Sequence, residues 1–126
     1  FVGLWRGTVQ EQFVNYVYPQ ENGNKSDVRW VALTDLRGIG LRAEGMPLLN
    51  VSAHHYSTEN LTQALHTYDL VRLDETILNL DHAHCGLGSN SCGPLPLDAY
   101  LLKPVETRFS LRLRPVADAL IPTPRT

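Results

Sequence analysis

The sequence predicts an all-β chain, folded as an antiparallel β-sandwich with one short helix. Most of its segments are short runs of alternating or continuous apolar residues between turns, one segment alone has helical spacing, and no internal repeat occurs. The 126 residues suffice for one domain with a core but not for two. We expect this domain to span residues 1–115 and an irregular tail, with two prolines near its end, to occupy residues 116–126.

The clearest strand signal lies in residues 108–114, RFSLRLR, where three apolar side chains alternate with three arginines and a serine. A period of two places the apolar side chains on one face and the polar ones on the other. Pro115 is expected to end this strand, because proline cannot donate a hydrogen bond to a ladder. Residues 49–54 alternate in the same way and predict a second strand.

A hairpin is predicted between residues 28 and 43. Residues 28–34, VRWVALT, are apolar on both faces and indicate a strand buried on two sides, with Trp30 in the core. The following DLRG and IGLRA predict a tight turn in which Gly38 takes a positive φ. Two further strands are expected, over residues 76–80 (TILNL) and 13–18 (FVNYVY).

The helix is predicted from a capping signal and apolar spacing. Ser57 is a plausible N-cap, and Leu61, Ala64 and Leu65 follow it at helical spacing. Two or three turns are expected there.

Composition excludes several classes of partner. A formal net charge of −2 provides no basic field for nucleic acid or an anionic membrane, and no apolar run approaches the roughly 20 residues that span a bilayer. Two cysteines do not form a disulfide scaffold, so we expect a cytoplasmic protein. The start at Phe1, without a basic or long apolar stretch, indicates a chain cut from a larger protein.

The loop LNLDHAHCGLGSNSCGP (78–94) concentrates potential ligands. His82, His84, Cys85 and Cys92 carry atoms that zinc accepts, yet they show no paired CxxC or HExxH spacing, which favours a hydrogen-bonded loop without metal. We expect buried or half-buried free thiols, although the sequence also allows a disulfide between the two cysteines.

Carboxylates and aromatic residues give weaker signals. Glu21 in PQENG and Asp81 in LDHAH stand in unusual contexts, but turn capping is the favoured interpretation of both. The aromatic residues could stack on sugar rings, but nothing in the sequence gathers them on one surface.

Three motifs in this order resemble one family: YPQENGNKSDVRWVAL (18–33), VSAHHYSTENLTQALHTYDL (51–70) and TILNLDHAHCGLGSNSCGP (76–94). They are similar to the C-terminal domain of the large bacterial β-galactosidases of glycoside hydrolase family 2, and the resemblance extends from Phe1 to about Pro115. It implies part of a galactose-mutarotase-like supersandwich. It also implies a retaining enzyme whose two catalytic glutamates lie on a separate barrel domain, so that no catalytic residue is expected on this chain.

The resemblance implies partners as well. These are the other domains of the same enzyme, above all the catalytic barrel, a galactoside substrate such as lactose, and further copies in a homo-oligomer. Magnesium and sodium are held mainly by other domains in this family, so neither a metal nor another cofactor is expected on this chain.

In this family the loop that matches residues 86–94 reaches the barrel and helps to close the active site. There a tryptophan, in a pattern like SWSP, supports the sugar, whereas this sequence has Ser91-Cys92-Gly93-Pro94. A thiol lacks the stacking area of a tryptophan, so the pocket edge is expected to be wider. The resemblance marks Asn90, Ser91 and Cys92 as substrate-binding residues, and Gly86, Gly88 and Gly93 are expected to form turns that a side chain would forbid.

Two alternatives stay open. One is a non-catalytic carbohydrate-binding module. The other is a free-standing mutarotase-like enzyme, which would need a histidine and a carboxylate to converge, as His54, His55 or His66 could with Glu21. The accessory-domain hypothesis predicts exposed apolar surface where other domains dock.

Overall fold

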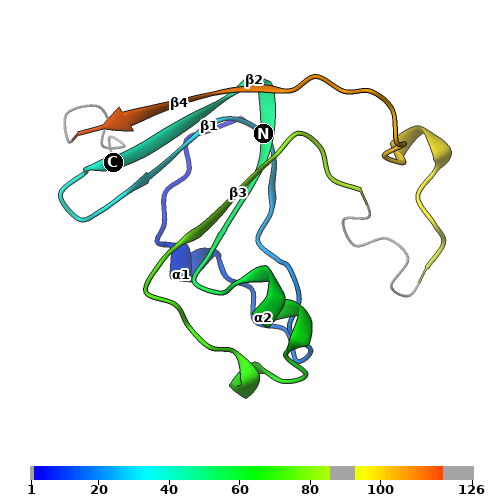
Figure 1. Ribbon diagram of the computed structural model, residues 1–126, viewed down its shortest axis with the longest axis horizontal. Helices are drawn as coiled ribbons and strands as arrows, with labels where there is room; N and C mark the ends of the chain where they lie inside the picture. Colours follow the sequence, from blue (N-terminus) through cyan, green and yellow to red (C-terminus); the bar gives the residue numbers. More distant parts are fainter. Residues whose placement is uncertain (1, 86–92, 118–126) are drawn as a thin grey trace. The chain divides into compact units, whose positions relative to one another are not determined.

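The computed structural model describes residues 2–85 and 93–117 (Figure 1). Its elements are α1 (Val9–Gln12), β1 (Lys25–Thr34), β2 (Gly40–His54), α2 (Thr58–Gln63), β3 (Ile77–Asp81) and β4 (Ser110–Val116), with 3-10 turns at Thr67–Asp69 and Asp98–Tyr100. The strands form one sheet in the order β1-β2-β3, and β4 also pairs with β2. The predicted all-β class is confirmed, with the largely antiparallel pairing expected of a sandwich-type domain.

The chain divides into two compact units. The first comprises residues 1–25 and 51–80, and the second comprises residues 26–50 and 81–126. Strand β2 contributes its first eleven positions, residues 40–50, to the second unit and its last four, residues 51–54, to the first. Within the part of the chain that the structure describes, no helix is long and apolar enough to cross a membrane.

The predicted hairpin of the second unit is confirmed. Asp35 begins the turn: its Oδ1 accepts hydrogen bonds from the backbone N–H groups of Arg37 (2.8 Å) and Ile39 (3.0 Å). Gly38 has a φ of 78°, which a residue with a side chain adopts only at a cost. Trp30 is half-buried instead of lying in a core, so the prediction of a strand buried on two sides was wrong.

Strand β4 differs from its prediction at both ends. It begins at Ser110 and continues through Pro115, which lies opposite Leu41 of β2. The expectation that Pro115 ends the strand was therefore wrong. Among the described strands β4 pairs with β2 alone, so it is an edge strand, where proline is tolerated because its missing N–H costs no ladder bond when it faces outward.

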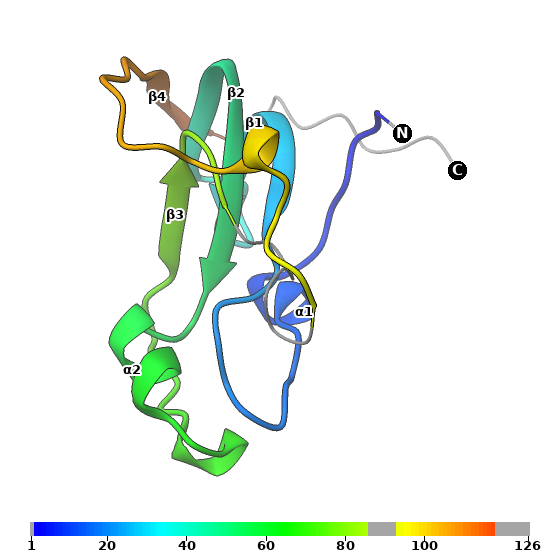
Figure 2. The same ribbon diagram turned by 90° about the vertical axis from the view of Figure 1, so that its right-hand side faces the viewer.

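The predicted helix of the first unit is confirmed as α2, which follows the end of β2 and precedes the 3-10 turn at Thr67–Asp69 (Figure 2). The Ser57 hydroxyl accepts a hydrogen bond from the N–H of Asn60, as an N-cap does. Leu61 and Ala64 are buried, whereas Leu65 is 58% exposed because the helix ends at Gln63.

Two features near the start of the chain were not predicted correctly. Residues 13–18 form no strand, although their aromatic and β-branched residues predicted one. In addition, α1 starts at a capping box in which the Thr8 hydroxyl accepts from the Glu11 N–H and the Glu11 carboxylate accepts from the Thr8 N–H. The sequence contains this T-x-x-E signal, so α1 could have been predicted.

Candidate functional site

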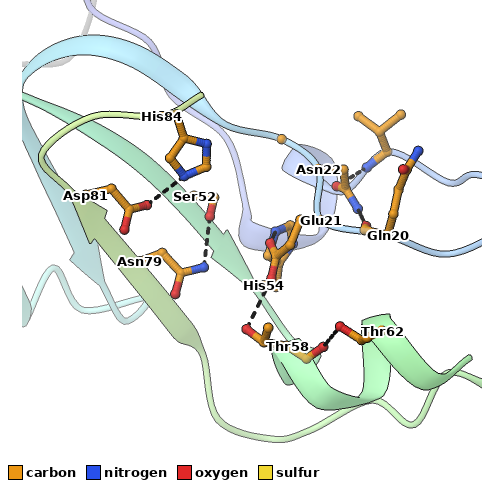
Figure 3. A network of polar contacts seen from close by, with 12 residues as sticks. Gln20, Glu21, Asn22, Ser52, His54, Thr58, Thr62, Asn79, Asp81 and His84 are labelled. Carbon is orange, nitrogen blue, oxygen red and sulfur yellow. Dashed lines mark hydrogen bonds and ion pairs between the residues drawn. The ribbon is translucent and has the colours of Figure 1, made fainter. Parts of the chain in front are cut away.

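The PQENG turn holds the first candidate residues, and its asparagine fixes its shape (Figure 3). Asn22 Oδ1 accepts a hydrogen bond from the Val14 N–H (2.9 Å), and Asn22 Nδ2 donates to the Gln20 carbonyl (2.9 Å). Gly23 follows with a φ of 69°. A Cβ at Gly23 would lie 2.6 Å from the Gln12 carbonyl oxygen, so this position requires glycine for two reasons. The Asn-Gly pair thus shapes a loop, but residues 19–24 form no regular turn, so the expected turn is not confirmed.

Glu21 projects from this turn towards the end of β2 and the start of α2, as Figure 3 shows. Its Oε1 accepts a hydrogen bond from the Thr58 hydroxyl (3.1 Å), and its Oε2 lies 3.5 Å from His54 Nε2. Glu21 thus contacts two residues that lie 33 and 37 positions further along the chain. The expectation that Glu21 caps its own turn was wrong.

His54 is buried, with only 1% of its side chain exposed, while the Glu21 side chain is 45% exposed. The Phe13 ring meets the imidazole edge to face, with ring centroids 6.1 Å apart. Neither imidazole nitrogen makes a hydrogen bond within the described residues, and 3.5 Å is too long for one to Glu21. A ring so enclosed can form an ion pair with Glu21 when protonated, but it cannot reach a sugar in solution.

The other two histidines of the mutarotase alternative do not join Glu21. His55 Nδ1 lies 3.0 Å from the Glu75 carbonyl oxygen. His66 stacks on Tyr68 with ring centroids 4.9 Å apart, and its Nδ1 lies 3.5 Å from Asp69 Oδ2. Of the three candidate pairs, the structure therefore brings together only His54 and Glu21, in a geometry that closes the imidazole off from substrate.

The glycine-rich loop is described at its two ends. At its start, His84 Nε2 lies 3.1 Å from Asp81 Oδ2, whereas the His82 ring packs against Phe109 with centroids 5.3 Å apart. These two histidines thus have different surroundings, and no group of three or more potential metal ligands occurs within residues 2–85 and 93–117. Asp81 contacts the His84 ring instead of acting through the expected turn cap.

Cys85 is an exposed free thiol, so the expectation of a buried or half-buried thiol was wrong at this position. The predicted substrate-binding residues, Asn90, Ser91 and Cys92, lie outside the described residues, as do Gly86 and Gly88. At Gly93, no described atom lies within 4 Å of where a Cβ would be, so the described surroundings leave room for a side chain there.

Comparison with known proteins gives the family. The family model for the β-galactosidase small chain matches residues 1–113. A β-galactosidase of Arthrobacter sp. (strain B7) is 36% identical over 118 residues, which cover 90% of this chain and 12% of the relative. A β-galactosidase of Kluyveromyces lactis is 35% identical over 114 residues, covering 88% of this chain and 11% of the relative.

A third relative, a β-galactosidase of Priestia megaterium, is 35% identical over 89 residues, which cover 71% of this chain and 9% of the relative. The chain thus spans between 9% and 12% of the length of these relatives. The match to the family model covers most of the chain, including the PQENG turn, β2, α2 and the glycine-rich loop. This chain therefore belongs to the β-galactosidase small-chain family.

Proposed function

We propose that this chain is an accessory domain of a retaining β-galactosidase, which hydrolyses terminal β-D-galactosides such as lactose. The observation that carries the proposal is the family match over residues 1–113, together with relatives named β-galactosidase of which the matched segment is a small part. In this proposal the domain does no chemistry itself, and the catalytic glutamates and the magnesium and sodium ions belong to other parts of the enzyme.

Two carboxylates in unusual sequence contexts fit a non-catalytic role. A retaining glycosidase needs two carboxyl groups about 5–5.5 Å apart on either side of the sugar. Glu21 and Asp81, the two carboxylates that the sequence singled out, are each engaged with a histidine. Glu21 is in addition held by Thr58. Each contact gives the carboxylate a structural partner.

The exposed apolar side chains support docking to other domains. Five apolar residues of the described part are buried, whereas two stretches of the chain expose several large apolar side chains. The exposed side chains of these stretches are Val14, Tyr16, Val17 and Tyr18 in the first, and Leu95, Leu97, Tyr100, Leu101, Leu102 and Val105 in the second. Exposure on this scale is typical of a surface that a partner covers.

The glycine-rich loop is the part that we propose to reach the substrate, with Asn90, Ser91 and Cys92 at the edge of the pocket. This assignment rests on the position of these residues in the loop motif of the family.

A replacement experiment tests the proposal. The matched segment of the Arthrobacter β-galactosidase would be deleted, or replaced in frame by this chain, and both proteins assayed with a chromogenic β-galactoside. We expect no hydrolysis by the isolated chain, loss of hydrolysis in the deletion, and recovery in the replacement. A replacement in which residues 86–92 are changed to a Gly-Ser linker would control for the loop, and we expect it to restore assembly but not full activity.

The opposite results separate the alternatives. Hydrolysis by the isolated chain would contradict a non-catalytic role. Tight galactose binding by the isolated chain would favour a carbohydrate-binding module, and acceleration of galactose anomer exchange would favour a mutarotase-like enzyme.

A further inference from the structure

Three arginines surround a single carboxylate on one face of the strand pair β2–β4. Glu44 of β2 lies opposite Arg112 of β4, and Arg42 lies opposite Arg114. Alternate residues of a strand point to the same side, so these four side chains share a face of the sheet. We call this set (Arg42, Glu44, Arg112 and Arg114) the arginine face.

The contacts within the arginine face are ionic. Arg114 Nη2 donates a hydrogen bond to Glu44 Oε1, and Arg42 Nε lies 2.9 Å from the same oxygen. Arg112 Nη1 is 3.8 Å from Glu44 Oε2, beyond hydrogen-bonding distance. Burial alone would raise the pKa of Glu44, but the hydrogen bond from Arg114 and the charges of all three arginines hold it below its ordinary value. Glu44 is therefore ionised at neutral pH.

The arginine face has an excess of positive charge and of hydrogen-bond donors. Three guanidinium charges less one carboxylate charge leave two positive charges, whereas the whole chain has a formal net charge of −2. Each guanidinium carries five N–H donors. Three such groups therefore have more donors than the two oxygens of one carboxylate can accept. The positive charge is thus a local feature of this face and not part of a general basic field.

The three arginines are not equally free. The Arg42 guanidinium lies 4.1 Å from the centre of the Trp30 ring, and its side chain is 22% exposed. In contrast, the side chains of Arg112 and Arg114 are 64% and 51% exposed. Arg42 is therefore held in place by an aromatic ring and by Glu44, while Arg112 and Arg114 present donors to the solvent.

We propose that the arginine face binds an acidic segment in the remainder of the enzyme. That this segment belongs to the same enzyme rests on the proposed function. Alternate residues of an extended segment are roughly 7 Å apart, as Arg112 and Arg114 are expected to be on β4, so carboxylates at alternate positions could meet both guanidinium groups. Charge complementarity identifies this occupant, since the arginine face carries two positive charges in excess on a chain whose formal net charge is −2.

The first test uses the 126-residue chain and a blocked peptide of alternating glutamate and serine, followed by NMR at low ionic strength. We expect saturable shifts of the arginine Nε–Hε signals and of the amides of β4, and none with a peptide in which glutamine replaces glutamate. The double variant Arg112→Gln, Arg114→Gln should bind about tenfold more weakly. The double variant Arg112→Lys, Arg114→Lys keeps the charge and should lose less affinity.

A matched control removes the same charge elsewhere. The double variant Arg29→Gln, Arg108→Gln has the same net charge as the first variant, and we expect it to bind the peptide like the original chain. Equal weakening in both variants would overturn the inference, as would inorganic phosphate shifting the same signals with equal affinity, because either result would mean general anion attraction.

The second test addresses the source of the acidic segment. Amide hydrogen exchange of β4 would be measured in the isolated chain and in the intact enzyme that carries it. Slower exchange in the intact enzyme, abolished by Arg112→Gln with Arg114→Gln but not by the control pair, would support the inference, and unchanged exchange would overturn it. Neither test measures hydrolysis, so a failure of the proposed function is detected separately.

Discussion

His54 shows how a single residue can depart from a correct pattern. The alternation over residues 49–54 predicted the strand but also implied a polar outer face, whereas Ser52 and His54 are buried, as is Val51 on the opposite face. The face that was expected to be polar is covered within the first unit: Phe13 packs against His54, and Asn79 Nδ2 donates to the Ser52 hydroxyl (3.1 Å). A period of two identifies the faces of a strand but not what covers them.

The burial of His54 leads to a prediction about stability. Changing His54 to alanine should lower the free energy of unfolding by about 2–4 kcal/mol, because it leaves a cavity beside Phe13 and deprives the Glu21 carboxylate of its neighbour. Urea unfolding of the purified chain would measure the loss.

Leu65→Ala is the matched control, since Leu65 is 58% exposed and its truncation should change stability by less than about 0.5 kcal/mol. Similar losses in both variants would argue against a structural role for the His54 pair.

Among the elements, those with strong local signals were predicted and those that depend on distant contacts were not. The hairpin turn at Gly38 and the N-cap at Ser57 are specified by neighbouring residues, and both are present. Residues 13–18 have strand-forming residues but no strand. There the Val14 N–H, which a ladder would use, bonds to the Asn22 side chain instead. Residue preference alone cannot reveal that competing acceptor.

The hairpin contains a close backbone contact at Gly40 that could not be predicted from the sequence. This contact leads to a prediction about the packing of β1 against β2. A Cβ at Gly40 would lie 1.9 Å from the Leu33 carbonyl oxygen and 2.7 Å from the Thr34 Cα, both backbone atoms that cannot move aside alone. Gly40→Ala should therefore push β1 and β2 apart locally and cost about 1–3 kcal/mol of stability.

Thermal unfolding of Gly40→Ala beside Gly93→Ala would check this, because no described atom lies within 4 Å of a Cβ at Gly93. An unchanged melting temperature in Gly40→Ala would mean that the strands do not approach each other so closely.

For the molecule as a whole, the sequence predicted the all-β class and the family, while the placement of its candidate site stays a prediction. Three motifs in a fixed order specify a family better than any single motif does, and the PQENG segment has its own contacts through Asn22 and its own positive φ at Gly23. The pairing of Glu21 with His54 and Thr58, and the convergence of Arg112 and Arg114 on Glu44, join positions distant in sequence. Such contacts arise only when the chain folds.

One prediction belongs to the assembled enzyme. If Cys92 stands where relatives of the family carry a tryptophan, Cys92→Trp in the Arthrobacter replacement protein should tighten galactose binding about three- to tenfold, because an aromatic face adds stacking area. The inhibition constant of galactose would measure this. Cys92→Ser is the control and should leave binding unchanged, and an equal effect of both substitutions would argue against a platform at this position.

The thin core of the chain has a consequence for how it tolerates substitution. Side chains such as Val17 and Tyr100 are exposed here, 90% and 73% respectively, and changing them to polar residues should barely affect the isolated chain. If other domains cover them, as we propose, the same changes would be as harmful in the enzyme as substitutions in an ordinary interior. Selection would then act on these positions through neighbours that this chain does not contain.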